Sequence, residues 1–410
     1  MAYNGTFLFK STDSGAPVLT GRAYSTAPTE TLINLLNVVF VDGYNTQTSC
    51  SVTRTTNVAT VAKTAHGFRD GAVVRHTGFD YADYNIDAKI TVLDANSYTY
   101  LVANSPTTPG GTSGTAKVCP LDWGVHANNS TQQRAWQQPS DVGVTNRCWL
   151  SMYDALTGSA RYRGYTGTFT AASFPSATLP DSDGGTSFPT VAQQSGGFYI
   201  TRSSDSSSSA RAWVVISDRR TIYVFIKYST STTCHAFSFG QITSYRNATD
   251  NWPTAITGNL DSANNGALQS LMLSPSTAWT STVQGMHFAG AYNATGAGSI
   301  AGSKPVLYGA TAGSLYPGHA ASINYTAPIQ GGLMLQRMIV VEATANTDIR
   351  GHMAGLWFPW HQRPLSEDTT FTGATGSDID GRTFYVVGSP GTGGTLGQMF
   401  VELRDGSYWD

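Results

Sequence analysis

Two sequence patterns meet at Cys50. The stretch before it, PTETLINLLNVVFVDGY at residues 28–44, has the apolar spacing of an amphipathic helix followed by a turn. From Cys50 onward Ser, Thr and Val alternate, as in SVTRTTNVATVAK, with Val52, Val58 and Val61 spaced for the faces of strands. Side chains repeat every two residues in a strand and every 3.6 in a helix, so one element cannot satisfy both patterns. The chain therefore changes here from a helical segment to a β segment.

The segment 51–118 has the signals of a small β-module. AVVRHTG predicts a second strand, and NIDAKITVLDANSYTYLV predicts two more around an Asp-Ala-Asn turn. The segment ends in NSPTTPGGTSGT, a run of Pro, Gly, Ser and Thr that is typical of a loop or linker. About four or five short strands in a segment of this length predict a small sandwich or barrel.

The rest of the chain predicts one large β-domain. Two apolar runs, 213–216 and 222–226, are joined by Ser217-Asp218-Arg219-Arg220, which predicts a hairpin. Their almost continuous apolar character predicts central strands that are covered on both faces. LMLQRMIVVEA and RTFYVVG predict two further strands. The expected fold is mainly β: a large β-sandwich-like host domain with one N-terminal helix and the small module inserted in it.

Composition restricts the function classes. Charged residues make up 12% of the chain, against roughly 25% in ordinary globular domains. With 40% apolar residues and a formal net charge of -2, the chain should fold. A nucleic-acid partner is not expected, because phosphate binding needs clustered Lys and Arg. A surface of this kind is common in proteins of large assemblies, and an ordinary secreted β-protein is the open alternative.

No targeting or membrane segment is expected. The start, MAYNGTFLFKSTDSGAP, lacks the basic and long apolar regions of a signal peptide. No apolar run approaches the roughly eighteen residues that span a bilayer. We therefore expect a protein that is made in a cytoplasm and has no membrane partner.

The sequence indicates no catalytic, cofactor or metal site. It has no G-x-x-x-x-G-K-[ST] loop, no G-x-S-x-G elbow and no H-E-x-x-H pair. His352 and His361 flank aromatic residues and are expected to be structural. Asp378 and Asp380 precede a glycine as in a calcium loop, but the other ligand positions are missing, so a turn with an Asx hydrogen bond is favoured. LPDSDGG at residues 179–185 has the same interpretation.

Several stretches, taken in order, resemble a family of bacteriophage virion structural proteins. They are GAPVLTGRAYSTAPTETLINLLNVVFVDGY, NRCWLSMYDALTGSARYRGYTGTF, SSSSARAWVVISDRRTIYVFIKYS, HAFSFGQITSY and IRGHMAGLWFPWHQRPL. Together they cover roughly half of the chain, and none is a catalytic signature. The pattern of segment 51–118 resembles the small β-modules that decorate phage tail and baseplate proteins.

This resemblance explains the change at Cys50 as an insertion. In the family, the turn after the helix leads almost directly into the segment that reads here LDWGVHANNSTQQRAWQQ. The host domain would then comprise residues 1–50 and 119–410, and the module residues 51–118. The ends of an inserted domain should lie close together. Cys50 and Cys119 stand at these ends, so we expect neighbouring thiols or a disulfide, with free thiols first because the cytoplasm is reducing. Cys148 and Cys234 are expected to be small buried side chains.

The resemblance implies a non-enzymatic part of a virion, in the tail or baseplate, that assembles with copies of itself and with neighbouring tail proteins. Two alternatives remain open. A glycan depolymerase needs two carboxylates across a sugar, and the 26 acidic residues leave such a pair possible but unindicated. An adhesin would stack sugars on exposed rings, but most of the 9 Trp and 20 Tyr are needed in the core of so large a β-protein.

The segment GLWFPWHQRPL predicts a subunit contact. Trp357, Phe358 and Trp360 fall within four residues, and Arg363 follows. Strand alternation would send Trp357 and Phe358 to opposite faces, and Pro359 disfavours a regular central strand. Aromatic residues and Arg are enriched at interface hot spots. The alternative is that these rings only cover the core of the domain itself.

Overall fold

The structure is a computed structural model of the 410-residue chain. It describes residues 3–103, 106–126, 132–144, 146–166, 187–188, 197–229, 234–245, 250–259, 284–289, 304–306, 335–342, 348–359, 365–388 and 398–409.

The described residues form two sheets and very little helix, so the fold is mainly β as predicted. One sheet has 18 strands and the other has seven. The large sheet contains β1 (Phe7–Lys10), β9 (Gly124–Val125), β10 (Gln133–Gln137), β11 (Trp149–Tyr153), β12 (Ser159–Tyr165), β13 (Ser187–Phe188), β14 (Phe198–Thr201), β15 (Trp213–Ser217), β16 (Thr221–Lys227), β17 (Cys234–Ser244), β18 (Thr254–Asn259), β19 (Gln284–Phe288), β20 (Lys304–Val306), β21 (Leu335–Glu342), β22 (Asp348–Pro359), β23 (Thr370–Thr372), β24 (Thr383–Gly388) and β25 (Gln398–Leu403). The small sheet contains β2 (Tyr44–Thr55), β3 (Val58–Ala62), β4 (Val73–Thr77), β5 (Asp87–Lys89), β6 (Thr91–Asp94), β7 (Ser97–Leu101) and β8 (Gly114–Val118). The helical turns are η1 (Pro28–Glu30), α1 (Leu32–Asn37), η2 (Val38–Asp42) and η3 (Ala82–Tyr84).

The predicted N-terminal helix is α1, which continues into the π-helical turn η2. The Thr31 side chain accepts a hydrogen bond from the backbone N–H of Asn34, which caps the helix start. The segment ends at Gly43, whose φ of 71° is a left-handed conformation that glycine adopts without strain. Its apolar face is fully buried, with Leu32, Leu35, Leu36, Val39 and Phe40 all at 0% exposure.

The predicted central hairpin is β15–β16. Ser217 pairs with Ile222, and the pairing continues to Trp213 opposite Ile226. Every residue of β15 is buried, and so is every residue of β16 except Lys227. The prediction of strands that are covered on both faces is thereby confirmed.

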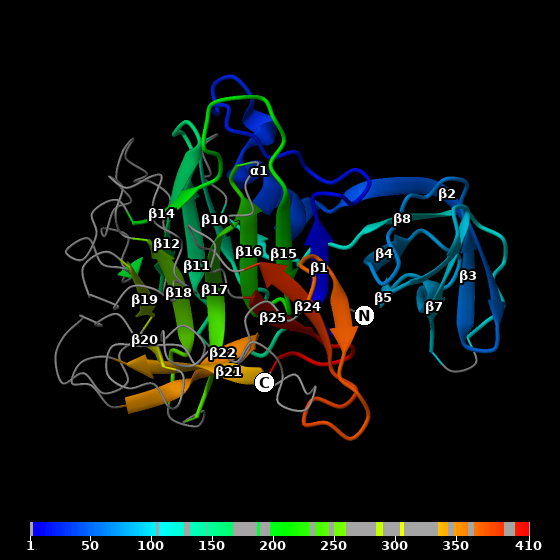
Figure 1. The fold of residues 1–410 in the computed structure, drawn as a ribbon. Helices are drawn as coiled ribbons and strands as arrows, with labels where there is room; N and C mark the ends of the chain where they lie inside the picture. The colour runs from blue at the N-terminus through cyan, green and yellow to red at the C-terminus, as the bar shows by residue number, and fades with distance from the viewer. Residues whose placement is uncertain are drawn as a thin grey trace.

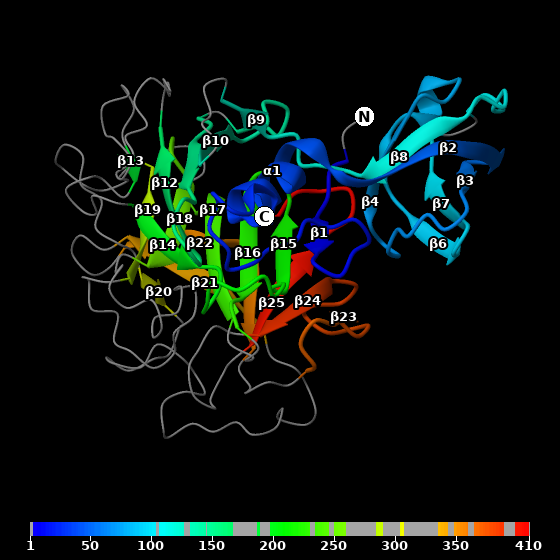
Figure 2. The ribbon, with the colours of Figure 1, turned by 90° about the horizontal axis from the view of Figure 1, so that it is seen from above.

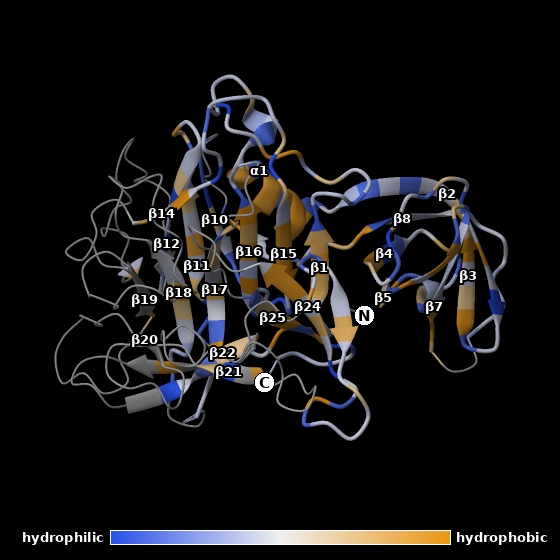
Figure 3. Cartoon of the chain, viewed as in Figure 1, coloured by the Kyte–Doolittle hydropathy of each residue, from blue (hydrophilic) through white to orange (hydrophobic). Residues whose placement is uncertain are grey.

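The two faces of this hairpin belong to two different hydrophobic cores. Val215 and Val224 pack in the core that includes α1. Val214 and Tyr223 pack in a second core with residues of β22, β24 and β25. Figures 1 and 2 show α1 on one side of β15 and β16, and β24 and β25 on the other. The host is therefore layered as α1, then β15 and β16, then β24 and β25, and both strand layers belong to the 18-stranded sheet. Figure 3 shows apolar residues concentrated on α1, β15 and β16.

The small sheet is folded into two layers that share β2. Cys50 in β2 pairs with Gly114 of β8, whereas the next residue, Ser51, pairs with Ala62 of β3. The β2–β8 ladder has register shifts, and within them Asn45 and Ser49 have positive φ of 52° and 57°. Such bulges bend a strand, which lets one strand serve both layers. The result is the expected small β-sandwich, seen projecting to the right in Figure 1.

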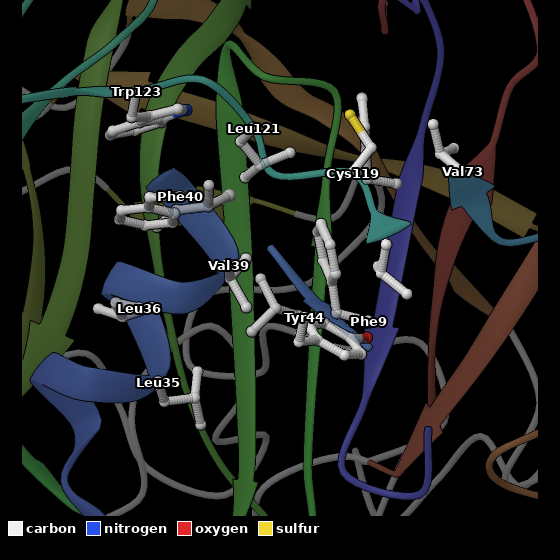
Figure 4. Close-up of a cluster of buried hydrophobic side chains, with 14 of the residues drawn as sticks. Phe9, Leu35, Leu36, Val39, Phe40, Tyr44, Val73, Cys119, Leu121 and Trp123 are labelled. Carbon is white, nitrogen blue, oxygen red and sulfur yellow. The ribbon is translucent and has the colours of Figure 1, made fainter. Parts of the chain in front are cut away.

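The seven strands of the small sheet lie between Tyr44 and Val118. The position proposed for the module boundary, between Cys50 and Ser51, falls inside the continuous strand β2. One hydrophobic core also runs from the host into the small sheet. Figure 4 shows Phe9 of β1 and Val73 of β4 in this shared cluster, with Tyr44 and Cys119. The division of the chain into two domains remains a prediction.

Candidate functional site

Of the four predicted interface residues, Trp357 is the one whose side chain the structure describes. It lies in β22, opposite Arg337 of β21 and Phe400 of β25. Phe358 follows it in the same strand, while Trp360 and Arg363 lie outside the described residues. The strand ends at Pro359, which agrees with the effect expected of a proline.

The Trp357 ring is half-buried against residues of its own chain. Its indole N–H donates to Oε2 of Glu402 at 3.2 Å, and Phe384 meets it edge-on at a centroid distance of 5.9 Å. The guanidinium carbons of Arg337 and Arg382 lie 5.0 and 5.5 Å from the ring centroid. Both cations are within the range of a cation–π interaction, which stabilises the ring and the guanidinium groups. A subunit contact through this segment remains a prediction.

Charged residues concentrate instead where the small sheet meets the host. Arg75 of β4 forms a bidentate pair with Asp87 of β5, with both N–O distances at 2.8 Å. Its Nη1 also donates to Oδ1 of Asp122 at 2.9 Å, just before β9 of the host. A planar guanidinium can hold two carboxylates in fixed directions. Arg75 therefore fixes the small sheet to the segment that leads back into the host.

Arg219 continues this network on the host side. It stands in the turn between β15 and β16 with a φ of 72° and is almost completely buried. Its two terminal nitrogens pair with Asp141 at 2.9 and 3.0 Å, and one of them lies 3.6 Å from Asp122. Its Nε donates to the carbonyl oxygen of Leu121 at 3.1 Å. The central hairpin thus reaches the small sheet through Asp122 and Arg75.

A second arginine fixes the small sheet to β1. Arg69 donates from Nε to Oδ1 of Asp13 at 2.9 Å and from Nη2 to the carbonyl oxygen of Leu8 at 2.7 Å. The other oxygen of Asp13 accepts the hydroxyl of Tyr44 at 2.8 Å. Burial, and then the Asp13 charge, hold the pKa of Tyr44 well above its ordinary value. The tyrosine therefore stays protonated and able to donate.

A cleft of about 610 Å³ opens beside the third contact between the two parts. Lys89 of β5 pairs with Asp405 at 2.8 Å, and the hydroxyl of Tyr3 donates to the same carboxylate at 2.8 Å. The cleft is lined by apolar residues of the small sheet, which include Tyr100 and Leu101.

A buried histidine joins the two layers of the small sheet. His76 of β4 stacks on Tyr100 of β7 at a centroid distance of 4.0 Å and an angle of 16°. Its Nδ1 lies 3.0 Å from the carbonyl oxygen of Ile86, so Nδ1 carries the proton, and Nε2 accepts the hydroxyl of Tyr98 at 3.1 Å. Burial lowers the pKa of His76 to about 4. The ring is therefore neutral near pH 7, and every polar atom of it has a partner.

A buried ion pair supports the start of α1. Asp154 accepts the backbone N–H of Leu32 at 2.6 Å, and its other oxygen pairs with Nε of Arg202 at 3.0 Å. Both side chains are at 0% exposure. Burial raises the pKa of Asp154 to about 6, although Arg202 and the helix N–H groups act in the opposite direction. We interpret the pair as ionised at neutral pH, because a protonated Asp154 would leave the Arg202 charge buried alone.

The cysteines are all free and buried. Cys50 pairs with Gly114, whereas Cys119 follows Val118, which pairs with Tyr44 at the other end of the same ladder. A strand advances about 3.3 Å per residue, so five residues of β8 separate the thiols by roughly 16 Å. A disulfide needs Cα atoms within about 7 Å, so this register does not bring Cys50 and Cys119 together.

The remaining residues considered as ligands do not form a metal site in the described part of the chain. No group of three His, Cys, Asp or Glu side chains there is placed to hold a metal ion. Asp380 accepts the backbone N–H of Gly376 at 2.8 Å, so it is used in a turn. His352 contacts Nη1 of Arg337 at 2.6 Å, while His361 and residues 179–185 lie outside the described residues. No described helix is long and apolar enough to cross a membrane.

Comparisons with known proteins add little. No protein-family model matches the chain, and neither does any curated protein. Among solved structures, phage phi92 endosialidase has 12% sequence identity over 87% of this chain and 69% of its own, with a TM-score of 0.17. A TM-score this low does not show a shared fold, so no activity or partner follows from it.

Sequence reasoning missed the charged contacts between the small sheet and the host. Arg69 and Asp13 are 56 positions apart, and Arg75 and Asp122 are 47 apart. The available signal was the small number of charged residues. In a chain with 12% charged residues, an arginine inside a β-module is expected to have a specific partner.

Proposed function

We propose that this protein is a non-enzymatic structural component of a bacteriophage particle, in its tail or baseplate. It would assemble there with copies of itself and with neighbouring tail proteins.

The observation that carries the proposal is the rigid attachment of the small sheet to the host. Arg69 and Arg75 each bridge the two parts through well-formed ion pairs, and Lys89 adds a third contact. The apolar core is continuous across the same junction. A module on a flexible linker would need none of these contacts. A structural component of an assembly, by contrast, must keep its parts in fixed relative positions.

The resemblance to virion structural proteins supports the same role through its location. Four of the similar stretches supply β11–β12, β15–β16, β17 and β22, and the remaining one supplies η1, α1 and η2. All of these belong to the host layers, and none extends past Tyr44 into the small sheet. The similar residues are therefore those that build the framework.

Four buried tryptophans favour a building block over a sugar-binding adhesin. Trp123, Trp136, Trp213 and Trp409 are at most 4% exposed, so these rings cannot stack on a sugar. The charged side chains at the junction and below α1 are engaged with one another, which favours a structural role over catalysis.

The proposal is tested by antibody labelling of intact particles and by mass spectrometry of purified ones. A structural component is present in many copies per particle and gives regularly spaced label on the tail. A protein that is absent from purified particles is not a virion component.

The aromatic segment gives a second test. Trp360→Ala should reduce incorporation into particles while the isolated chain stays folded, and Trp357→Ala is the comparison because that ring packs on its own chain. If Trp360→Ala unfolds the isolated chain, or is incorporated normally, the segment is not an interface.

A further inference from the structure

The cleft beside Lys89 has the composition of a protein interface. Its lining includes Val58, Ile86, Ile90 and Tyr100. Leu101 also lines it, with 67% of its surface exposed. Exposed aliphatic side chains around a concave surface favour an apolar side chain of another polypeptide, since burial of both removes carbon from water.

The rim of the cleft carries one unmatched negative charge. Asp405 is neutralised by Lys89, and Asp87 by Arg75. Asp70 accepts the backbone N–H of Val92 at 2.9 Å, and no cation pairs with it in the described part of the chain. The cleft therefore suits an apolar side chain that stands next to a basic one.

The host carries that combination on two neighbouring strands. Tyr153 of β11 and Arg161 of β12 are directly opposite each other in the ladder. Both are partly exposed, and one part of the Tyr153 ring packs against Ala135 and Tyr165 of its own chain. Arg161 forms no ion pair with any described residue. Figure 1 shows β11 and β12 on the side of the host sheet away from the small sheet.

We propose that the cleft of one copy binds the Tyr153 and Arg161 surface of a second copy, head to tail. The two surfaces differ and lie on opposite sides, so the contact is heterologous, and repetition gives a ring or an open sleeve. This inference rests on the proposed structural role and names the surfaces that would carry it.

The first experiment compares two exposed leucines of the same sheet. Leu101 lines the cleft, whereas Leu93 is 58% exposed and does not line it. We expect the purified wild-type chain to self-associate with rising concentration in sedimentation velocity. Leu101→Asp should weaken this association at least ten-fold, and Leu93→Asp should not change it. Equal behaviour of both variants, or a wild type that stays monomeric, overturns the proposal.

The second experiment uses complementary charges. Asp70→Lys places a cation opposite Arg161, and Arg161→Glu places an anion opposite Asp70, so each variant alone should lose self-association. A mixture of the two should recover it, because each variant supplies the surface that the other lacks. Thermal unfolding of each variant verifies that it is folded.

If both variants are folded and their mixture does not recover self-association, the proposal is overturned. If the Leu101→Asp chain is also incorporated normally into particles, the cleft is not a subunit contact at all. If it self-associates normally but is lost from particles, the occupant is a different virion protein. Either result leaves the proposed virion role standing, since that role is judged by the presence of the wild-type chain in particles.

Discussion

The Nε atom of Arg69 lies 2.9 Å from Oδ1 of Asp13, and this contact joins two parts of the chain with different strand patterns. The Asp13 side chain is only 6% exposed and the Arg69 side chain 28%. A pair this well covered is less screened than a surface pair. It also leaves an uncompensated carboxylate when the arginine is removed.

Removal of Arg69 should therefore loosen the small sheet from the host. We expect Arg69→Ala to lower the free energy of unfolding by about 1–3 kcal/mol, because Asp13 loses a charged partner and Leu8 loses a donor. Arg54→Ala, which removes an arginine of the same module that donates to Thr56 and Thr108, is the control. Limited proteolysis should cut the variant faster near residues 43 and 119. An unchanged proteolysis rate would contradict this account of the attachment.

Loss of the ion pair between Arg202 and Asp154 at the start of α1 should lower the free energy of unfolding more than loss of Arg69. Arg202→Met leaves the fully buried Asp154 carboxylate without its cation, which costs about 3–5 kcal/mol of unfolding free energy. Arg22→Met removes an arginine from a pair at the surface near η1 and should change stability by less than about 1 kcal/mol. Denaturant unfolding measures both. Similar losses of unfolding free energy in the two variants would show that the buried pair stabilises the fold no more than the surface pair does.

Acid should destabilise the small sheet through His76. Its pKa is about 4 in the folded chain and about 6.5 when unfolded, so the unfolded state binds more protons between these values. The stability that the neutral, buried His76 ring contributes is lost as pH falls from about 6.5 to about 4, at up to about 1.4 kcal/mol per pH unit. Asp154, whose pKa burial raises to about 6, acts in the opposite direction, so the variant must be compared with the wild type.

The variant His76→Gln should lose less stability than the wild type as the pH falls, because it lacks the group whose pKa burial lowers. Unfolding free energies at pH 7 and pH 5 give the two slopes. A His76→Gln chain that loses as much stability between these values as the wild type would contradict the assignment.

Removal of the small sheet should leave a folded host. Gly43 and Val118 are adjacent, since a Cβ on Gly43 would lie 2.4 Å from the carbonyl oxygen of Val118. After the sheet, Leu121 and Trp123 donate backbone hydrogen bonds to Val39 and Phe40, so the returning chain is already fixed. We expect deletion of residues 44–118, with a short Gly/Ser link, to lower the melting temperature but keep a cooperative transition. Loss of cooperativity would mean that the host and the small sheet are one folding unit.

The sequence predicted those elements whose signals are local. The apolar run of β15–β16 and the alternation in β2 and β3 follow directly from how side chains repeat along a strand. The Asp-Ala-Asn turn also lies where expected, between β6 and β7, and Asp94 accepts the backbone N–H of Asn96 there.

The contacts that hold these elements together were not predictable. The spacing of apolar residues does not show that β2 continues through Cys50. The bulges at Asn45 and Ser49 interrupt the alternation by which a strand is recognised. Nor does the spacing show that Arg69 reaches Asp13 or that Trp357 packs on Phe384. Such pairs depend on how separate strands meet, and one sequence carries no record of that.

The central claim is that this chain is a repeated structural part of a phage tail. An electron cryo-microscopy map of the intact particle tests it most directly. The account predicts density for the layered host, with the small β-sandwich rigidly attached, in several copies around the tail axis. Particles that contain no such density, or a single copy away from the tail, would contradict it.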